Sequence, residues 1–272
     1  MKQRDLILSS GTLENPPLAD VLEAARAGGY NGITLWPGDY HPARRGSERL
    51  AEMRARLDDA GLPLLDVDAL IAWVGSDDPG PPYYEEAPEP EVFEMADALG
   101  AKGVNVLLAC APDASEAQAI DIFAGICERA SAHNLQVHIE FSRGRIPCDI
   151  PSALELVMRS GAQNAGLMVD AWHVHWGTGS FDDLARAPGS LVSGVQLNDA
   201  PAETPADLSH ATRYARRAPG EGCIDLAGVL RDLDKIASTA PLTVEVFDPA
   251  AVEREGVVPF ACRLADAVRA LR

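Results

Sequence analysis

Short apolar runs alternate with segments of helical periodicity along the whole chain. Runs rich in leucine and β-branched residues predict strands at 6–11, 32–37, 62–70, 103–109, 135–141, 165–171, 192–199 and 242–247. Apolar residues at helical spacing predict helices at 17–28, 47–60, 89–100, 115–133, 151–161, 180–187, 225–239 and 257–271. Because neighbouring parallel strands need a crossover, which is usually a helix, this alternation predicts an α/β fold with a parallel sheet.

Eight strand–helix units in 272 residues match a single-domain (β/α)₈ TIM barrel over residues 1–272. A doubly wound open sheet is the alternative. It is disfavoured because the stretch after the first predicted strand, SSGTLENPP, holds one glycine where a phosphate-binding turn has several. The stretch 77–91 is rich in proline and acidic residues and is expected to form a loop on the catalytic face, where Tyr83 and Tyr84 either cover a substrate or are solvated.

The charge and the cysteines narrow the class of protein. Lysine and arginine number 23 against 41 acidic residues, a formal charge of -18, which repels phosphate backbones and argues against nucleic acid as a partner. No apolar run approaches the length that spans a membrane, and the N-terminus lacks a signal-peptide pattern. The five cysteines are widely spaced without a CxxC pair, so we expect no disulfide framework and a cytoplasmic location.

Four consecutive predicted strands end in residues that bind metals or move protons. Glu140 ends the fifth strand, Asp170 the sixth and Glu245 the eighth, while the seventh offers Gln196 and Asp199. A single acid at a strand end is as readily a helix cap or an ion-pair partner. Three desolvated carboxylates at one barrel mouth repel one another unless a divalent cation neutralises them. Carboxylate and amide oxygens favour Mn²⁺ or Mg²⁺ over zinc.

Short motifs in the second half of the chain carry a family resemblance: IEF, the D-x-x-H pattern from Asp170 to His173, the Q-x-x-D pattern from Gln196, RRAPGEG at 216–222 followed by Asp225, and VEVF. Together they resemble the xylose isomerase-like TIM barrel superfamily, which includes sugar-phosphate isomerase/epimerases, ketose 3-epimerases, and 3-dehydroshikimate and inosose dehydratases. The resemblance implies four metal ligands: Glu140, Asp170, Gln196 and Glu245. The family usually has histidine at the third position, but members similar to 3-dehydroshikimate dehydratases also carry glutamine.

The same resemblance assigns substrate contacts. His173 is expected to bond a substrate oxygen or assist proton transfer, which its ordinary pKa near neutrality suits. Arg216 is expected to reach a substrate oxygen or phosphate with its planar guanidinium, and Arg217 is the alternative. The two remaining histidines of interest are His138, which shares a barrel face with Glu140 and is either a substrate contact or a hydrogen-bonded core residue, and His175, expected at the surface.

Two tryptophans follow predicted strands near the expected mouth. Trp36 ends the second strand, and Trp73 lies just past the third. Either ring can stack on a sugar or simply pack in the core, and the sequence leaves both roles open.

The expected reaction is metal-assisted removal of a proton next to the carbonyl of a keto-sugar or sugar-like polyol, with Glu140 and Glu245 serving opposite faces. Isomerase/epimerase ranks first. A dehydratase of the 3-dehydroshikimate or inosose type, with His173 as acid, ranks second and is favoured by Gln196. An apurinic endonuclease fits poorly with few histidines and a charge of -18, and a catalytically silent sugar-binding barrel stays open. The expected partner is a small sugar-like molecule, phosphorylated or not, with a homo-oligomer possible.

Overall fold

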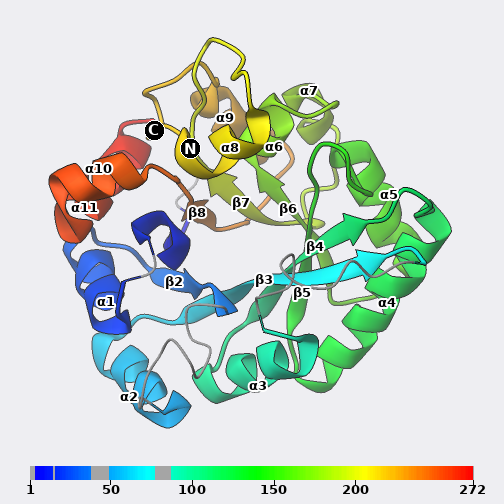
Figure 1. Cartoon of the computed structure of the whole chain (residues 1–272), viewed down its shortest axis with the longest axis horizontal. Coiled ribbons are helices and arrows are strands. Elements are labelled where there is room, and N and C mark those ends of the chain that lie inside the picture. The colour runs from blue at the N-terminus through cyan, green and yellow to red at the C-terminus, as the bar shows by residue number, and fades with distance from the viewer. Residues whose placement is uncertain (1–3, 15, 38–48, 77–86, 272) are drawn as a thin grey trace.

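Eight parallel strands close a barrel in chain order, with β8 paired to β1 (Figure 1). The computed structural model describes residues 4–14, 16–37, 49–76 and 87–271. The strands are β1 Leu6–Ser9, β2 Gly32–Leu35, β3 Leu64–Val74, β4 Gly103–Cys110, β5 Gln136–Glu140, β6 Ala165–Asp170, β7 Val192–Leu197 and β8 Leu242–Val244. The TIM barrel prediction is confirmed.

Helices form the outer layer around these strands (Figure 1). They are α1 Leu18–Ala27, α2 Leu50–Ala60, α3 Glu89–Leu99, α4 Glu116–Ala132, α5 Ile150–Ser160, α6 Ala171–His175, α7 Phe181–Leu184, α8 Leu208–Tyr214, α9 Leu226–Lys235, α10 Pro249–Glu255 and α11 Val257–Ala270, with a short 3-10 helix η1 at Ser10–Leu13. The sequence pattern missed the short helices α6, α8 and α10, and α7 is shorter than the helix predicted at 180–187.

Several predicted boundaries were wrong, including the ends of the third, first and eighth strands. The third strand continues four residues beyond its predicted end because β3 stays paired with β4 as far as Val74 and Cys110. The first strand ends at Ser9, and the chain turns at once into η1. The eighth strand ends at Val244, so Glu245 lies just beyond it. Tyr83 and Tyr84 lie outside the described residues.

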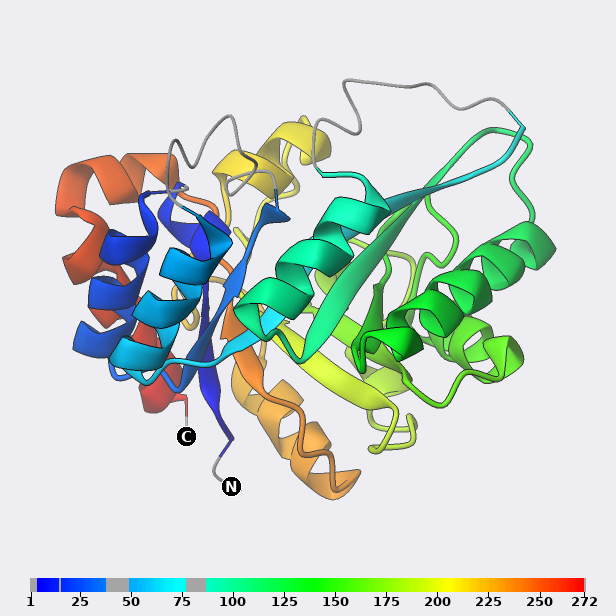
Figure 2. The same ribbon diagram turned by 90° about the horizontal axis from the view of Figure 1, so that it is seen from below.

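Buried side chains of the barrel include an apolar core and a set of polar groups. A continuous apolar core joins the strands to the helices. Within the barrel, the buried polar side chains include Asp66, Asp68, Asn105, His138, Glu140, Asp170, Gln196 and Glu245. The two chain ends lie at the amino ends of the strands, and α8 lies over the opposite end (Figure 2). Among the described helices, none is long and apolar enough to cross a membrane.

Candidate active site

A cavity of about 620 Å³ opens at the carboxyl ends of the strands. Its charged lining residues are Asp68, Glu140, His173, Glu245, Arg143, Arg145, Arg213 and Arg216. Its ring-bearing lining residues are Trp36, Trp172, Trp176 and Phe247. Active sites of TIM barrels lie at this end because the loops there are free to vary while the strands hold their positions.

Asp170 sits at the point where β6 turns into α6, and this turn explains why a strand ends in an acid. Its Oδ1 accepts the backbone N–H groups of Trp172 at 2.7 Å and His173 at 3.3 Å, so the carboxylate caps the new helix. The Nδ2 of Asn198 donates to the same oxygen at 3.0 Å. Asp170 is fully buried, with 0% exposure.

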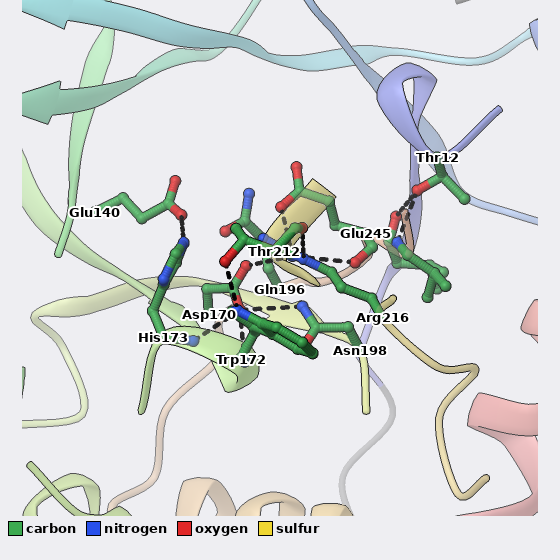
Figure 3. Close-up of polar contacts among 12 residues, drawn as sticks. Thr12, Glu140, Asp170, Trp172, His173, Gln196, Asn198, Thr212, Arg216 and Glu245 are labelled. Carbon is green, nitrogen blue, oxygen red and sulfur yellow. Dashed lines mark hydrogen bonds and ion pairs between the residues drawn. The ribbon is translucent and has the colours of Figure 1, made fainter. Parts of the chain in front are cut away.

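Arg216 joins Asp170 to Glu245 (Figure 3). Its Nη1 donates to Asp170 Oδ2 at 2.8 Å and to Glu245 Oε2 at 3.1 Å. Burial raises the pKa of Asp170, but Arg216, His173 and the hydrogen bond from Asn198 together outweigh it, and the pKa lies below its ordinary value. The ring of Phe247 lies 4.4 Å from the guanidinium carbon and shields the cluster on that side.

Glu140 lies beside His173 on the other side of the cluster, where Nε2 of His173 is 3.4 Å from Oε1 of Glu140 (Figure 3). One oxygen each from Glu140 and Asp170 and a ring nitrogen of His173 lie within 4.8 Å of one another. Burial, followed by the charges of Asp170 and Asp68, raises the pKa of Glu140 well above its ordinary value. Burial and Asp68 do the same to Glu245.

The pKa near neutrality expected for His173 does not hold in the fold. Burial, together with the charges of Arg216 and Arg145, lowers the pKa of this imidazole to about 4 against the opposing effect of Asp170. The imidazole is therefore neutral at neutral pH. It is suited to donating or accepting a hydrogen bond, and it is a poor source of a full proton.

The sequence analysis missed two polar residues, Asp68 and Asn105, which come from β3 and β4. Asn105 Nδ2 donates to Asp68 Oδ1 at 2.8 Å and to Glu140 Oε2 at 2.6 Å. The other oxygen of Asp68 accepts the Nε2 of Gln196 at 3.0 Å across the barrel. The available signal was DVDAL, in which two acids alternate with apolar residues inside a predicted strand.

Asp199 holds the loop that carries Arg216. Its carboxylate accepts four backbone N–H groups, from Ala200, Gly220, Gly222 and Ile224, at 2.8 to 3.0 Å. A Cβ on Gly222 would lie 2.3 Å from Asp199 Oδ1, so only glycine allows this approach. Asp199 is thus an anchor for the PGEG turn at 219–222.

The remaining predicted contacts separate into two groups. Trp36 lines the cavity, packed edge-on against Phe247 with ring centroids 5.4 Å apart. The structure does not place His138 at the cavity. Its ring nitrogens contact Ser193 at 2.6 Å and Asp66 at 3.0 Å, one layer below the mouth. His138 and Glu140 are two positions apart on β5, so they share a face of the strand but lie about 7 Å apart along its length. This difference in depth explains why Glu140 lines the cavity and His138 does not.

Three other side chains also lie off the lining of this cavity. Trp73 belongs to β3 itself rather than to a loop after it. His175 lies 3.5 Å from the thiol of Cys223, on the outer side of α6. Arg217 is exposed and donates to the backbone oxygen of Glu221 at 3.3 Å. Of the two adjacent arginines, Arg216 is the one that reaches the acidic cluster.

The residues of this cluster fit a divalent cation. Asp68, Glu140, Asp170 and Glu245 are four buried carboxyl groups, and Arg216 pairs with two of them. Neighbouring acids contribute to the raised pKa of Glu140 and of Glu245, and a divalent cation would offset that repulsion. The Oε1 of Gln196 is buried without a hydrogen-bond donor among the described residues. An unpartnered amide oxygen beside carboxylates is the donor type that hard divalent ions bind. Of the four predicted ligands, Glu140 and Asp170 each bring one oxygen within 4.8 Å of the other, and Asp170 and Glu245 share Arg216. The role of all four as metal ligands stays a prediction.

Three arginines bring positive charge to the same cavity, and together they are called the basic wall. Arg143, Arg145 and Arg213 line the cavity, and within the described part of the chain none of them forms a salt bridge. Arg145 also lies close enough to His173 to lower its pKa. Unpaired guanidinium groups facing a cavity are suited to an anionic group on a bound molecule.

Comparisons with known proteins identify relatives of this chain. The chain is 30% identical over 237 residues to a 3-dehydroshikimate dehydratase of Pseudomonas aeruginosa, covering 85% of this chain and 36% of that protein. It therefore spans about a third of that relative's length. It is 26% identical over 250 residues to an inosose isomerase of Bacillus licheniformis, covering 88% of this chain and 87% of that protein.

Similarity extends to solved structures and to a family profile. A crystal structure of the IOLI protein with a bound zinc atom superposes with a TM-score of 0.80 at 21% identity, covering 98% of this chain and 96% of that one. The profile of the family described as xylose isomerase-like TIM barrel matches residues 22–266. The chain belongs to the xylose isomerase-like TIM barrel family.

Proposed function

We propose that this protein is a divalent-metal-dependent dehydratase that removes water from a polyhydroxylated carbonyl compound bearing a carboxylate. The observation that carries the proposal is that one cavity is lined both by acidic residues, Glu140 among them, and by the three arginines of the basic wall. The relative named 3-dehydroshikimate dehydratase supports this substrate class. Because the basic wall suits a substrate with a carboxylate, we rank the dehydratase ahead of the isomerase/epimerase, which the sequence analysis ranked first.

A divalent ion held by Glu140, Asp170, Gln196 and Glu245 would supply polarisation of a carbonyl, which acidifies the neighbouring C–H bond. Glu140 takes that proton and returns it to the departing β-hydroxyl. One C–H and one C–O bond then break, a C=C bond forms and water leaves. Neutral His173 donates a hydrogen bond to a substrate oxygen.

The anionic end of the substrate is held by the basic wall. Arg145 is the arginine of this wall whose charge acts on His173, and its Nη1 donates to the backbone carbonyl oxygen of Leu108 at 3.4 Å. Its remaining N–H groups are available to a carboxylate. The indole rings of Trp36, Trp172 and Trp176 cover the apolar faces of a bound ring.

A second candidate is isomerisation of a neutral inosose, because the inosose isomerase is matched over nearly its full length. Proton removal by Glu140 serves this reaction equally well, with Glu245 returning a proton to the other face. The arginine wall is then without a substrate role, which is why this candidate ranks second.

The test uses the chelator-treated protein resupplied with Mn²⁺, Mg²⁺ or Zn²⁺, and offers 3-dehydroshikimate, inososes and keto-sugars in heavy water. We expect metal-dependent loss of water from 3-dehydroshikimate, seen as a new ultraviolet absorbance. Arg145→Gln should raise the KM for the carboxylate-bearing substrate more than for neutral ones. Deuterium exchange into an inosose without dehydration would establish the second candidate. Turnover unaffected by the chelator would contradict both.

A further inference from the structure

The amide of Gln196 has two chemically opposite ends, and only one of them suits a cation. Its oxygen is a metal ligand, whereas its NH₂ group repels a positive charge. Gln196 is fully buried and pairs in register with Asp170 on the neighbouring strand. Histidine, the usual residue at this position in the family, presents a nitrogen lone pair from a ring. For a glutamine, a neighbouring hydrogen-bonding group must determine which end of the amide faces the ion.

In this structure, Asp68 determines the orientation of the Gln196 amide. The Nε2 of Gln196 donates to Asp68 Oδ2 at 3.0 Å, while Gln196 Oε1 has no donor among the residues described. Turning the amide over would place its oxygen against a carboxylate oxygen and lose a charge-assisted hydrogen bond. The observed orientation is therefore the favoured one, and it leaves Oε1 uncommitted.

Asp68 is itself held in place. Its Oδ1 accepts from Asn105 Nδ2 at 2.8 Å, and the same nitrogen donates to Glu140 Oε2 at 2.6 Å. The side chain is almost fully buried, with 4% of the residue exposed. One hydrogen-bonded chain thus links Gln196 through Asp68 and Asn105 to Glu140, two of the four predicted ligands.

We propose that Asp68 is a positioning residue that orients the amide of Gln196, so that a glutamine serves as a metal ligand where a histidine is usual. This inference rests on the proposed metal-dependent function. It assigns Asp68 no contact with the ion itself. Groups that orient metal ligands typically change metal affinity by about 10- to 100-fold when they are removed.

The test is a double-mutant cycle on Mn²⁺ binding, measured by calorimetry on chelator-treated protein and checked by the paramagnetic resonance spectrum of bound Mn²⁺. Asp68→Ala should weaken Mn²⁺ binding by about 10- to 100-fold. Gln196→Glu places two equivalent oxygens at this position, so orientation no longer matters. In that background, we expect Asp68→Ala to weaken binding by less than about threefold, or to strengthen it by removing a repulsive neighbour.

Two further variants serve as an alternative to Asp68→Ala and as a control. Asp68→Asn keeps the side-chain volume and is taken through the same two backgrounds if Asp68→Ala does not fold. Asp66→Asn removes a buried acid two residues earlier on β3, where its partner is His138, and should leave Mn²⁺ affinity unchanged.

The outcomes separate this inference from the function on which it rests. An equal loss of affinity for Asp68→Ala in both backgrounds would overturn the positioning role, since Asp68 would then act on the ion by its own charge or ligation. Unchanged affinity in the Gln196 background would overturn it as well. A wild-type protein that binds none of Mn²⁺, Mg²⁺ and Zn²⁺ would overturn the proposed metal-dependent function together with this role.

Discussion

Replacing Arg216 by methionine tests the electrostatics of the site most directly. The substitution keeps an unbranched side chain under Phe247 but leaves Asp170 and Glu245 without their shared guanidinium partner. Removing one partner from a buried ion pair typically costs about 3–5 kcal/mol. Unfolding entropy of about 2.1 cal/mol/K per residue gives about 0.6 kcal/mol/K for this chain, so Tm should fall by about 5–9 °C.

This loss should depend on pH in a direction set by Asp170. Because Arg216 holds the pKa of Asp170 below its ordinary value, the stabilisation is present above about pH 4 and disappears as pH falls through the native pKa. Calorimetric Tm values of wild type and Arg216→Met, taken in chelator, should therefore differ at pH 7.5 and converge in acid. Mn²⁺ should stabilise the variant more than wild type, because the ion no longer competes with a guanidinium for the carboxylates of Asp170 and Glu245.

The matched control is Arg217→Met, which removes the adjacent but exposed arginine. It should change stability by no more than about 0.5 kcal/mol. The reasoning would be refuted if Arg216→Met cost less than about 1 kcal/mol at pH 7.5, if its cost were the same in acid, or if the Arg217 variant lost as much.

Three further predictions follow from other contacts. Glu140→Gln should lower kcat by about 10²- to 10⁴-fold without unfolding the protein, because it removes the proposed base; circular dichroism and steady-state rates check this. Without metal, stability should fall as pH rises above about 4.5, because Glu140 and Glu245 have raised native pKa values and so hold protons that the unfolded chain releases; the Tm of Glu140→Gln should vary less with pH. Asp199→Asn should cost at least about 2 kcal/mol and speed hydrogen exchange at the amides of 220–224, whereas unchanged exchange there would show that the turn holds itself.

Much of the site could be predicted from the sequence because parallel strands bring their carboxyl ends to one edge of the sheet. Glu140, Asp170, Gln196 and Glu245 each follow an apolar run, and closing the barrel places four consecutive strand ends around one mouth. The same rule failed for His138. It correctly gives the face of a residue on a strand but not the depth, and His138 pairs with Asp66 below the cavity.

Apolar periodicity along the chain was enough to determine the eight strands, most of the helices and the strand ends that carry acids, because burial of one face imposes that period locally. The tertiary structure alone decided which polar groups meet. Asp68 reaches Gln196 across the barrel although 128 positions separate them, and Arg216 is delivered by a loop anchored on Asp199. The pKa of about 4 at His173 likewise arises from burial and from neighbours distant in sequence. Hydrogen bonds and charges act over a few ångströms, so only the closed fold shows which partners lie within that range.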